Sequence, residues 1–113
     1  MLALRQYDCP ANVTYVEPGS ITFVYDSIYD HNRKVELQGT SGHIVENPLE
    51  DFLDAGLVLA VSNRNPEWRY AINPAAVASV VPRYGADGVT VHFANPGSTP
   101  TVSVVEYQGI TAK

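Results

Sequence analysis

The second half of the chain reads WRYAINPAAVASVVP (Trp68–Pro82), VTVHFANPGS (Val89–Ser98) and TPTVSVVEYQ (Thr99–Gln108). Apolar and polar residues alternate within these runs, and Asn-Pro, Gly or Pro separates one run from the next. Successive side chains of a β-strand point to opposite faces, so every second residue of Val89–Phe93 shares a face. Short alternating runs divided by turn residues are typical of an antiparallel β-meander.

Further strands are predicted nearer the amino terminus. Ile21–Tyr25 and Val35–Gln38 indicate a hairpin with a long polar tip, and weaker strands are expected at Leu2–Tyr7 and Val13–Val16. Leu57–Val61 is apolar throughout, which predicts a central strand covered on both faces. The sheet is therefore expected to contain most of the chain.

One helix is predicted in ENPLEDFLDAG, where Asn47 suits the N-cap, Pro48 the first helical position and Gly56 the stop. The helix should run from about Pro48 to Ala55 and pack on the sheet through an apolar stripe. That stripe consists of Leu49, Phe52 and Leu53. The predicted fold is mainly β, an antiparallel β-sandwich or partly open barrel with one short α-helix, and residues 1–113 form a single β-rich domain.

Composition restricts the class of protein. A chain of 113 residues suits one domain, and 45% hydrophobic with 17% charged residues indicates a folded chain. A net charge of −5 with seven Lys and Arg argues against nucleic acid as a partner, and there is no apolar run of the ~20 residues that a membrane span needs. The single cysteine, Cys9, cannot form an intramolecular disulfide and is expected to be a small buried hydrophobe. A soluble, cytoplasmic protein is expected.

No reactive site is expected. Asp26, Asp30 and His31 are the densest group of metal-ligand types, but calcium loops supply more carboxylates and zinc sites need more His or Cys. A solvated hairpin tip is therefore predicted, with no metal and no cofactor. His43 and His92 have no acid or nucleophile nearby in the sequence, and the GxSxG, GxxxxGK and GxGxxG motifs do not occur. We accordingly predict that the protein is not an enzyme and has no catalytic residues.

Two features leave alternatives open. Trp68 and Tyr70 share a strand face with Ile72, which favours a core position, and a ligand- or peptide-binding face is the alternative. Val13–Tyr25 and Val89–Tyr107 both read as strand, Pro-Gly-Ser turn, strand. Convergence on good turn residues is preferred over duplication as the explanation.

Two weak similarities suggest a role. VASVVPRYGADGVTVHFANPGSTPTVSVVEY (Val77–Tyr107), together with the small size, resembles the small β proteins that tailed bacteriophages use as capsid decoration or cement subunits. This resemblance implies a structural virion role, often as a trimer on a capsid lattice. RYAINPAAVASVVP (Arg69–Pro82) is similar in style to small bacterial regulatory β modules, which supplies the alternative of a ligand- or peptide-binding module.

The expected function is a structural protein-interaction subunit, most specifically a virion decoration or joining protein assembled in the host cytoplasm. Its partners would be other protein subunits, including copies of itself with a trimer favoured, and neither nucleic acid nor membrane. Rigid Pro-rich loops lose little entropy on docking, so they form the predicted interface. The predicted interface residues are Asn63, Asn65, Pro66, Asn95, Pro96, Ser98 and Pro100.

Overall fold

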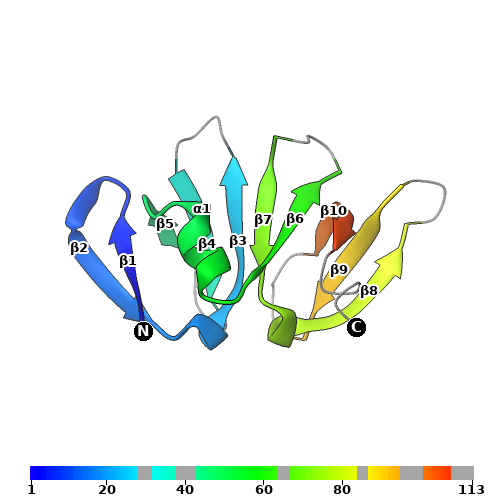
Figure 1. Ribbon diagram of the computed structural model, residues 1–113, viewed down its shortest axis with the longest axis horizontal. Helices are drawn as coiled ribbons and strands as arrows, with labels where there is room; N and C mark the ends of the chain where they lie inside the picture. The colour runs from blue at the N-terminus through cyan, green and yellow to red at the C-terminus, as the bar shows by residue number, and fades with distance from the viewer. Residues whose placement is uncertain (28–31, 38–42, 64–66, 84–86, 95–100, 108–113) are drawn as a thin grey trace.

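The computed structural model describes residues 1–27, 32–37, 43–63, 67–83, 87–94 and 101–107. They form one ten-stranded antiparallel sheet with a single short α-helix and two 3₁₀ helices (Figure 1). The strands are β1 (Leu2–Gln6), β2 (Cys9–Val16), β3 (Ile21–Ser27), β4 (Asn32–Leu37), β5 (His43–Val45), β6 (Val58–Ser62), β7 (Arg69–Ile72), β8 (Val77–Pro82), β9 (Val89–Phe93) and β10 (Val102–Tyr107); the helices are η1 (Pro18–Ser20), α1 (Leu49–Asp54) and η2 (Pro74–Ala76). The sheet runs from β2 at one end to β8 at the other and is not closed. The predicted mainly β, antiparallel fold with one short helix is confirmed.

The sheet consists of two halves with the same topology. The first unit, β1–β5, has the strand order β2-β1-β5-β4-β3, and the second unit, β6–β10, has the order β7-β6-β10-β9-β8. In each unit a hairpin is followed by a 3₁₀ helix that begins with proline, and then by three strands that pair in sequence. The units are joined edge to edge by pairing of β3 with β7.

The repeat extends to single residue pairs. Leu2 pairs with Val16 in the first unit, and Val58 pairs with Ile72 in the second. Each residue of the second pair lies 56 positions after its equivalent in the first. The same difference relates the β3–β4 pairs to the β8–β9 pairs, including a register irregularity at the start of β3 and of β8. Positions in β5 and β10 differ by 59, because the connection before β10 is three residues longer than the one before β5.

The sequence similarity between Val13–Tyr25 and Val89–Tyr107 is not this repeat. Val13–Tyr25 corresponds in register to Arg69–Val81, since both segments contain the second hairpin strand, the 3₁₀ helix and the third strand of their unit. Pro18 and Pro74 are among the few identical residues at equivalent positions. The duplication is therefore evident in backbone pairing and not in side-chain identity.

Each unit encloses its own hydrophobic core, and equivalent positions fill the two cores. Leu4, Val16, Val35 and Val45 of the first core correspond to Ala60, Ile72, Val91 and Val104 of the second. Strands β3 and β7 contribute to both cores, because alternate side chains of a strand face opposite sides. Val24 and Ala71 belong to the first core, whereas Phe23 and Ile72 belong to the second.

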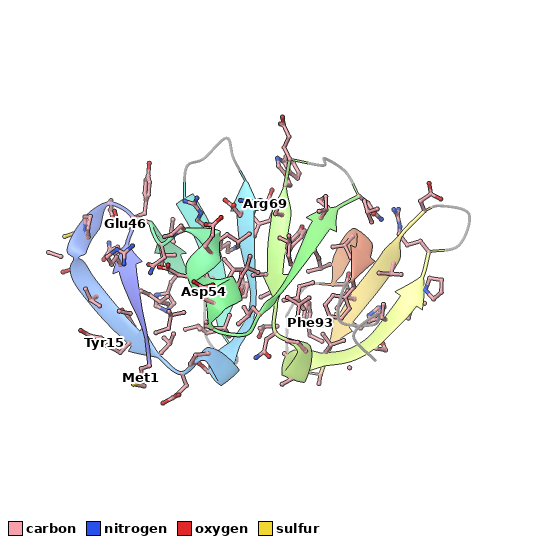
Figure 2. All side chains as sticks on the ribbon, viewed as in Figure 1. Met1, Tyr15, Glu46, Asp54, Arg69 and Phe93 are labelled. Carbon is pink, nitrogen blue, oxygen red and sulfur yellow. The ribbon has the colours of Figure 1, made fainter. Side chains whose placement is uncertain are left out.

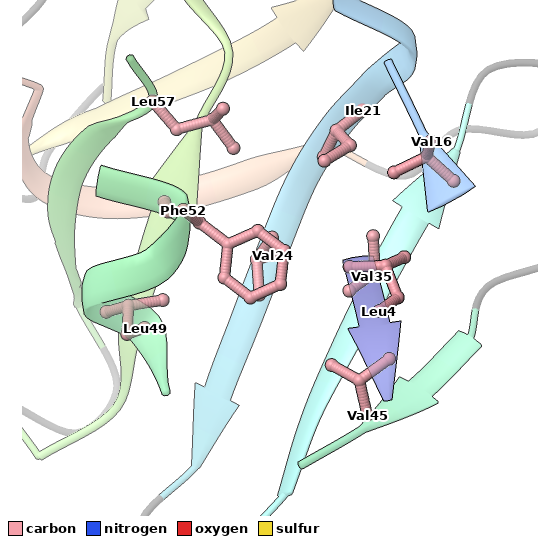
Figure 3. Close-up of a cluster of buried hydrophobic side chains, with 10 residues drawn as sticks. Leu4, Val16, Ile21, Val24, Val35, Val45, Leu49, Phe52 and Leu57 are labelled. Atoms are coloured by element: carbon pink, nitrogen blue, oxygen red, sulfur yellow. The ribbon is translucent and has the colours of Figure 1, made fainter. Parts of the chain in front are cut away.

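Helix α1 covers the first core. Leu49 and Phe52 are fully buried, and Figure 3 shows the Phe52 ring against Val24 of β3. Leu53 is partly buried and packs on the same core, so the predicted stripe is confirmed. The helix ends at Asp54, and Gly56 follows with a φ of 108°, a left-handed conformation that favours glycine at a helix stop.

Asn47 has a different role from the predicted N-cap. Pro48 occupies the N-cap position without a side-chain cap bond. The buried Asn47 amide instead contacts β1: its Oδ1 accepts from the Arg5 backbone N–H at 2.8 Å, and its Nδ2 donates to the Ala3 carbonyl at 2.9 Å. Among the described residues the register of β1 with β5 contains one pair, Gln6 with Val45, and this side chain extends their contact beyond the end of β5.

Two burial predictions are wrong. Strand β6 is central in its hydrogen bonding, between β7 and β10, but Leu59 is exposed while Ala60 and Ser62 are buried. An antiparallel sheet can leave one face in water, and β6 does so despite its apolar sequence. Cys9 is exposed and not buried, because β2 begins there and is an edge strand with most of its side chains in solvent.

Candidate functional site

The described residues enclose an open groove of about 590 Å³ in the first unit, between the β1–β2 hairpin and β5. Leu4 and Val45 contribute buried apolar side chains to it, and Thr14 lies opposite Leu4 on β2. The remaining lining residues are Gln6, Tyr7, Asp8, His43 and Ile44. The groove thus opens onto the first core at the end of the sheet, where no strand follows β2.

Polar groups gather where β1 turns into β2. The Gln6 side-chain amide donates to Asp8 Oδ1 at 2.6 Å, and Asn12 Nδ2 donates to Gln6 Oε1 at 3.1 Å. These bonds orient Gln6 at the mouth of the groove. An apolar interior with a polar rim suits a small apolar side chain presented by another polypeptide.

Exposed apolar side chains occupy both faces of the sheet at this end of the molecule. Tyr7 is 45% exposed and Ile44 43% exposed, and the Tyr7 N–H donates to the Ile44 carbonyl, which places the two residues together. Val13 and Tyr15 are exposed on the edge strand β2, with Tyr15 at 65%, on the face opposite to Thr14 and the groove. Figure 2 shows the Tyr15 side chain extending outward. The exposed apolar residues at this end of the sheet are together named the β2-end surface: Met1, Tyr7, Val13, Tyr15 and Ile44.

The equivalent region of the second unit is filled. Thr14 of the groove corresponds to Tyr70 in β7. The Tyr70 ring lies 5.3 Å from Tyr25 and 6.0 Å from Phe23 between ring centroids, and both of these rings come from β3, the edge of the first unit. A neighbouring β-strand therefore supplies side chains at the position where the first unit has an open groove.

Asp26 belongs to a buried ion cluster and not to a solvated tip. Its Oδ1 lies 3.2 Å from Arg33 Nε, and its Oδ2 accepts from Arg69 Nη2 at 2.8 Å. Arg33 is on β4 and Arg69 on β7, so the cluster bridges the two units. Both carboxylate oxygens face guanidinium groups, an environment that disfavours a bound cation. Asp30 and His31 lie outside the described residues.

The predicted interface loops are only partly described. Asn63 is half-buried: its N–H donates to the Ser103 carbonyl at 3.3 Å, and its Nδ2 donates to the Asp87 carbonyl at 3.2 Å. It thus joins β6 to β10 and to the turn before β9. The other predicted residues, Asn65, Pro66, Asn95, Pro96, Ser98 and Pro100, lie outside the described part of the chain.

The β2-end surface was not among the sites predicted from the sequence. A usable signal exists in CPANVTYV (Cys9–Val16), where Val13 and Tyr15 share one face of a strand and Val16 shares the other with Thr14. An edge strand and an interior strand have similar patterns, so this segment alone does not show that the Tyr15 side faces water.

Trp68 and Tyr70 lie in a row of packed aromatic rings. The Trp68 ring packs edge-on against Tyr25 at 6.0 Å, and Phe23 stacks on Phe93 at 5.3 Å. The Trp68 indole nitrogen is buried without a hydrogen-bond partner in the described structure. Tyr70 packs on the second core, in agreement with the preferred core interpretation of this residue, whereas Trp68 is half-buried at the end of the row and belongs to neither core cluster of the described residues.

The histidines lie apart. His43 is half-buried on β5 and lines the groove, whereas His92 is on β9, where it pairs with Ser79. Within the ranges given above, no three His, Cys, Asp or Glu side chains gather as a metal site. The described helix is also too short to cross a membrane.

Comparison of the chain with protein-family models, with curated proteins and with solved structures finds no match. The geometry of the site is therefore the basis for a functional proposal.

Proposed function

We propose that this protein is a structural subunit that binds other protein subunits through its β2-end surface, in the manner of a virion decoration or joining protein. The supporting observation is an open groove with a polar rim, lined by the exposed Tyr7 and Ile44, at the end of the sheet where Val13 and Tyr15 are exposed on the opposite face. Exposed apolar area together with a binding groove at one end of a protein marks an interaction site. The virion setting rests on the resemblance of Val77–Tyr107 to capsid decoration proteins.

The chemistry of the surface fits a polypeptide partner. Tyr7 and Tyr15 offer large apolar areas with a hydroxyl that can reach solvent, the combination found at protein interfaces. Strand β2 also has a free edge, so backbone N–H and C=O groups along it can pair with a strand of the partner. A partner would thus gain backbone hydrogen bonds from β2 and apolar contacts from the side chains around it.

The test is density-gradient fractionation of a lysate of the cells that produce the protein. The protein should sediment with assembled particles, and Ile44→Lys at the rim of the groove should move it to the unassembled fraction without changing its circular dichroism. Val105→Lys is the matched control, because Val105 is also an exposed apolar strand residue, 51% exposed, but lies on β10 away from the groove. A wild-type protein that never sediments with particles contradicts the proposed virion role.

The alternative is a small ligand-binding regulatory module. The buried, unpartnered Trp68 indole N–H beside a half-buried Tyr70 favours it, because a ligand could accept that hydrogen bond after a small movement of the ring. This alternative requires saturable quenching of Trp68 fluorescence by a small molecule. Such quenching in a protein that does not associate with particles would replace the structural proposal.

A further inference from the structure

We propose that the partner of the β2-end surface is a second copy of the chain, whose strand β8 pairs with β2 and inserts Val81 into the groove. This inference rests on the proposed function and names the partner of the same site. Strands β2 and β8 are the two ends of the sheet, and Figure 1 shows them at opposite ends of the molecule's long axis. Repetition of the contact would join copies head to tail.

The β3–β7 junction is the template for this contact. In it the third strand of one unit pairs with the second strand of the next, through Phe23 with Ile72, Val24 with Ala71, Tyr25 with Tyr70 and Asp26 with Arg69. Since the repeat relates the units by 56 residues, β8 is equivalent to β3 and β2 is equivalent to β7. The corresponding pairs between copies are Ser79 with Val16, Val80 with Tyr15, Val81 with Thr14 and Pro82 with Val13.

Tyr15 would cover an open part of the second core. In the first core Val24 is completely buried beside its cross-strand neighbour Ala71. The equivalent Val80 is only partly buried, and the residue equivalent to Ala71 is the exposed Tyr15. Pairing of β2 with β8 places the Tyr15 ring against Val80. The larger side chain suits the second core, which has no described helix in the place of α1.

Val81 would fill the groove of the first unit. Its equivalent at the internal junction is Tyr25, whose ring contacts Tyr70. At the proposed junction Val81, 45% exposed in a single copy, lies opposite Thr14, which lines the groove. The small Thr14 leaves the space that Tyr70 occupies in the second unit. The open groove and the exposed Val81 are therefore complementary.

The ends of the pairing are also defined. The pair equivalent to Asp26 and Arg69 is Pro82 with Val13, so an apolar contact replaces the ion pair. Proline has no N–H to donate, which ends the ladder at Pro82. Because the two surfaces differ, the interface is heterologous and produces a ring if the rotation closes and a filament if it does not.

Sedimentation velocity of the purified full chain tests the proposal. The wild type should form species larger than a monomer in a concentration-dependent manner. Tyr15→Lys blocks β2, and Val81→Lys blocks β8; each variant alone should remain monomeric, because every junction needs both surfaces. An equimolar mixture should form a heterodimer, in which the Tyr15→Lys copy supplies β8 and the Val81→Lys copy supplies β2. Val105→Lys should assemble like the wild type.

Cysteine cross-linking tests the register, in a Cys9→Ser background because Cys9 is exposed. Residues that face each other across antiparallel strands have Cα atoms about 4.5–5.5 Å apart, which suits a disulfide. Mixed Thr14→Cys and Val81→Cys proteins should therefore form a disulfide-linked heterodimer. Ala78→Cys, three residues from position 81 and so roughly 10 Å along the strand, should not cross-link to Thr14→Cys.

The outcomes distinguish the inference from the proposed function. A monomeric wild type, assembly of either blocked variant alone, or a mixture without heterodimer overturns head-to-tail pairing. If such a protein still sediments with particles and loses this association on Ile44→Lys, the proposed function stands and its partner is another protein. Head-to-tail assembly in a protein that never sediments with particles supports the inference and overturns the virion role.

Discussion

Individual residues in this protein differ in how their buried polar groups are satisfied. The hydroxyl of Tyr107 is buried in the second core without a hydrogen-bond partner in the described structure. Asp26 is equally buried, but two arginines engage its carboxylate. Removal of the two groups should therefore have opposite effects on the free energy of unfolding. An unpaired buried hydroxyl costs free energy while it is present, whereas loss of a paired buried carboxylate leaves its arginine partners without a counter-charge.

Tyr107→Phe should leave the free energy of unfolding unchanged or raise it by up to about 1 kcal/mol, since an unpartnered hydroxyl is removed. Burial raises the pKa of Tyr107 above its ordinary value of 10.0. Above pH 10.0 the Tyr107 hydroxyl ionises in the unfolded chain before it does in the folded protein. The unfolded state then binds fewer protons, so the free energy of unfolding of the wild type should fall as pH rises towards the raised pKa. Urea unfolding at neutral and alkaline pH should show a smaller fall for the variant; an equal fall would contradict the assignment.

Asp26→Asn should lower the free energy of unfolding by about 3–5 kcal/mol, because two guanidinium groups lose a buried counter-charge. The control is Glu46→Gln, which breaks the Arg5–Glu46 pair, where both side chains are more than one-third exposed. An exposed pair contributes only about 0–1 kcal/mol. Chemical denaturation measures both changes, and equal losses would show that Asp26 is solvated in solution.

The connection between β5 and β6 holds the first unit together. Helix α1 and the preceding Asn47 both act on the first unit, the helix by covering the core and Asn47 by bonding the backbone of β1. The helix could be predicted from its proline, its apolar spacing and its glycine. The bond from Asn47 to β1 could not, because its partners lie more than forty residues away in the sequence.

Phe52→Ala should destabilise the protein by about 3–5 kcal/mol, because a fully buried ring is removed from between the helix and β3. Leu59→Ala is the control, since Leu59 is an exposed apolar residue of β6. A change below about 1 kcal/mol for Phe52→Ala in urea unfolding would mean that α1 is not packed on the first core.

Asn47→Ala should cost roughly 1–3 kcal/mol by leaving backbone groups of Arg5 and Ala3 without partners. Asn12→Ala, which removes an exposed side-chain hydrogen bond, should cost much less. Thermal unfolding compares the two variants. A loss no larger than that of Asn12→Ala would assign Asn47 a minor role in fixing β1.

The two units share one continuous sheet whose central strands are β3 and β7. Both strands have a neighbour on each edge and contribute side chains to both cores. The strands at the two ends of the sheet have one free edge each. Stability should therefore be highest at the centre of the sheet and lowest at its ends.

Amide hydrogen exchange should follow this gradient, with slow exchange in β3 and β7. At the β3–β7 junction the Asn73 N–H donates to the Thr22 carbonyl. N–H groups of a strand point alternately to its two sides, so the N–H of Ala71 also points to β3, and the N–H of its equivalent, Tyr15, points to the free edge of β2. The Tyr15 amide should exchange rapidly at low protein concentration and slowly at high concentration, as β8 of another copy pairs with it. Exchange that is independent of concentration would contradict the pairing.

The amino-acid sequence predicts the class of fold, most strands and the single helix, because period-two alternation, turn residues and helix-end residues act over a few neighbouring positions. It did not reveal the duplication, since equivalent positions need only similar burial and seldom keep the same side chain. The burial of Asp26, the exposure of Leu59 and the open groove beside β2 follow from the packing of distant segments. These properties depend on which strand lies next to which, and backbone pairing between residues distant in the chain leaves little trace in local sequence.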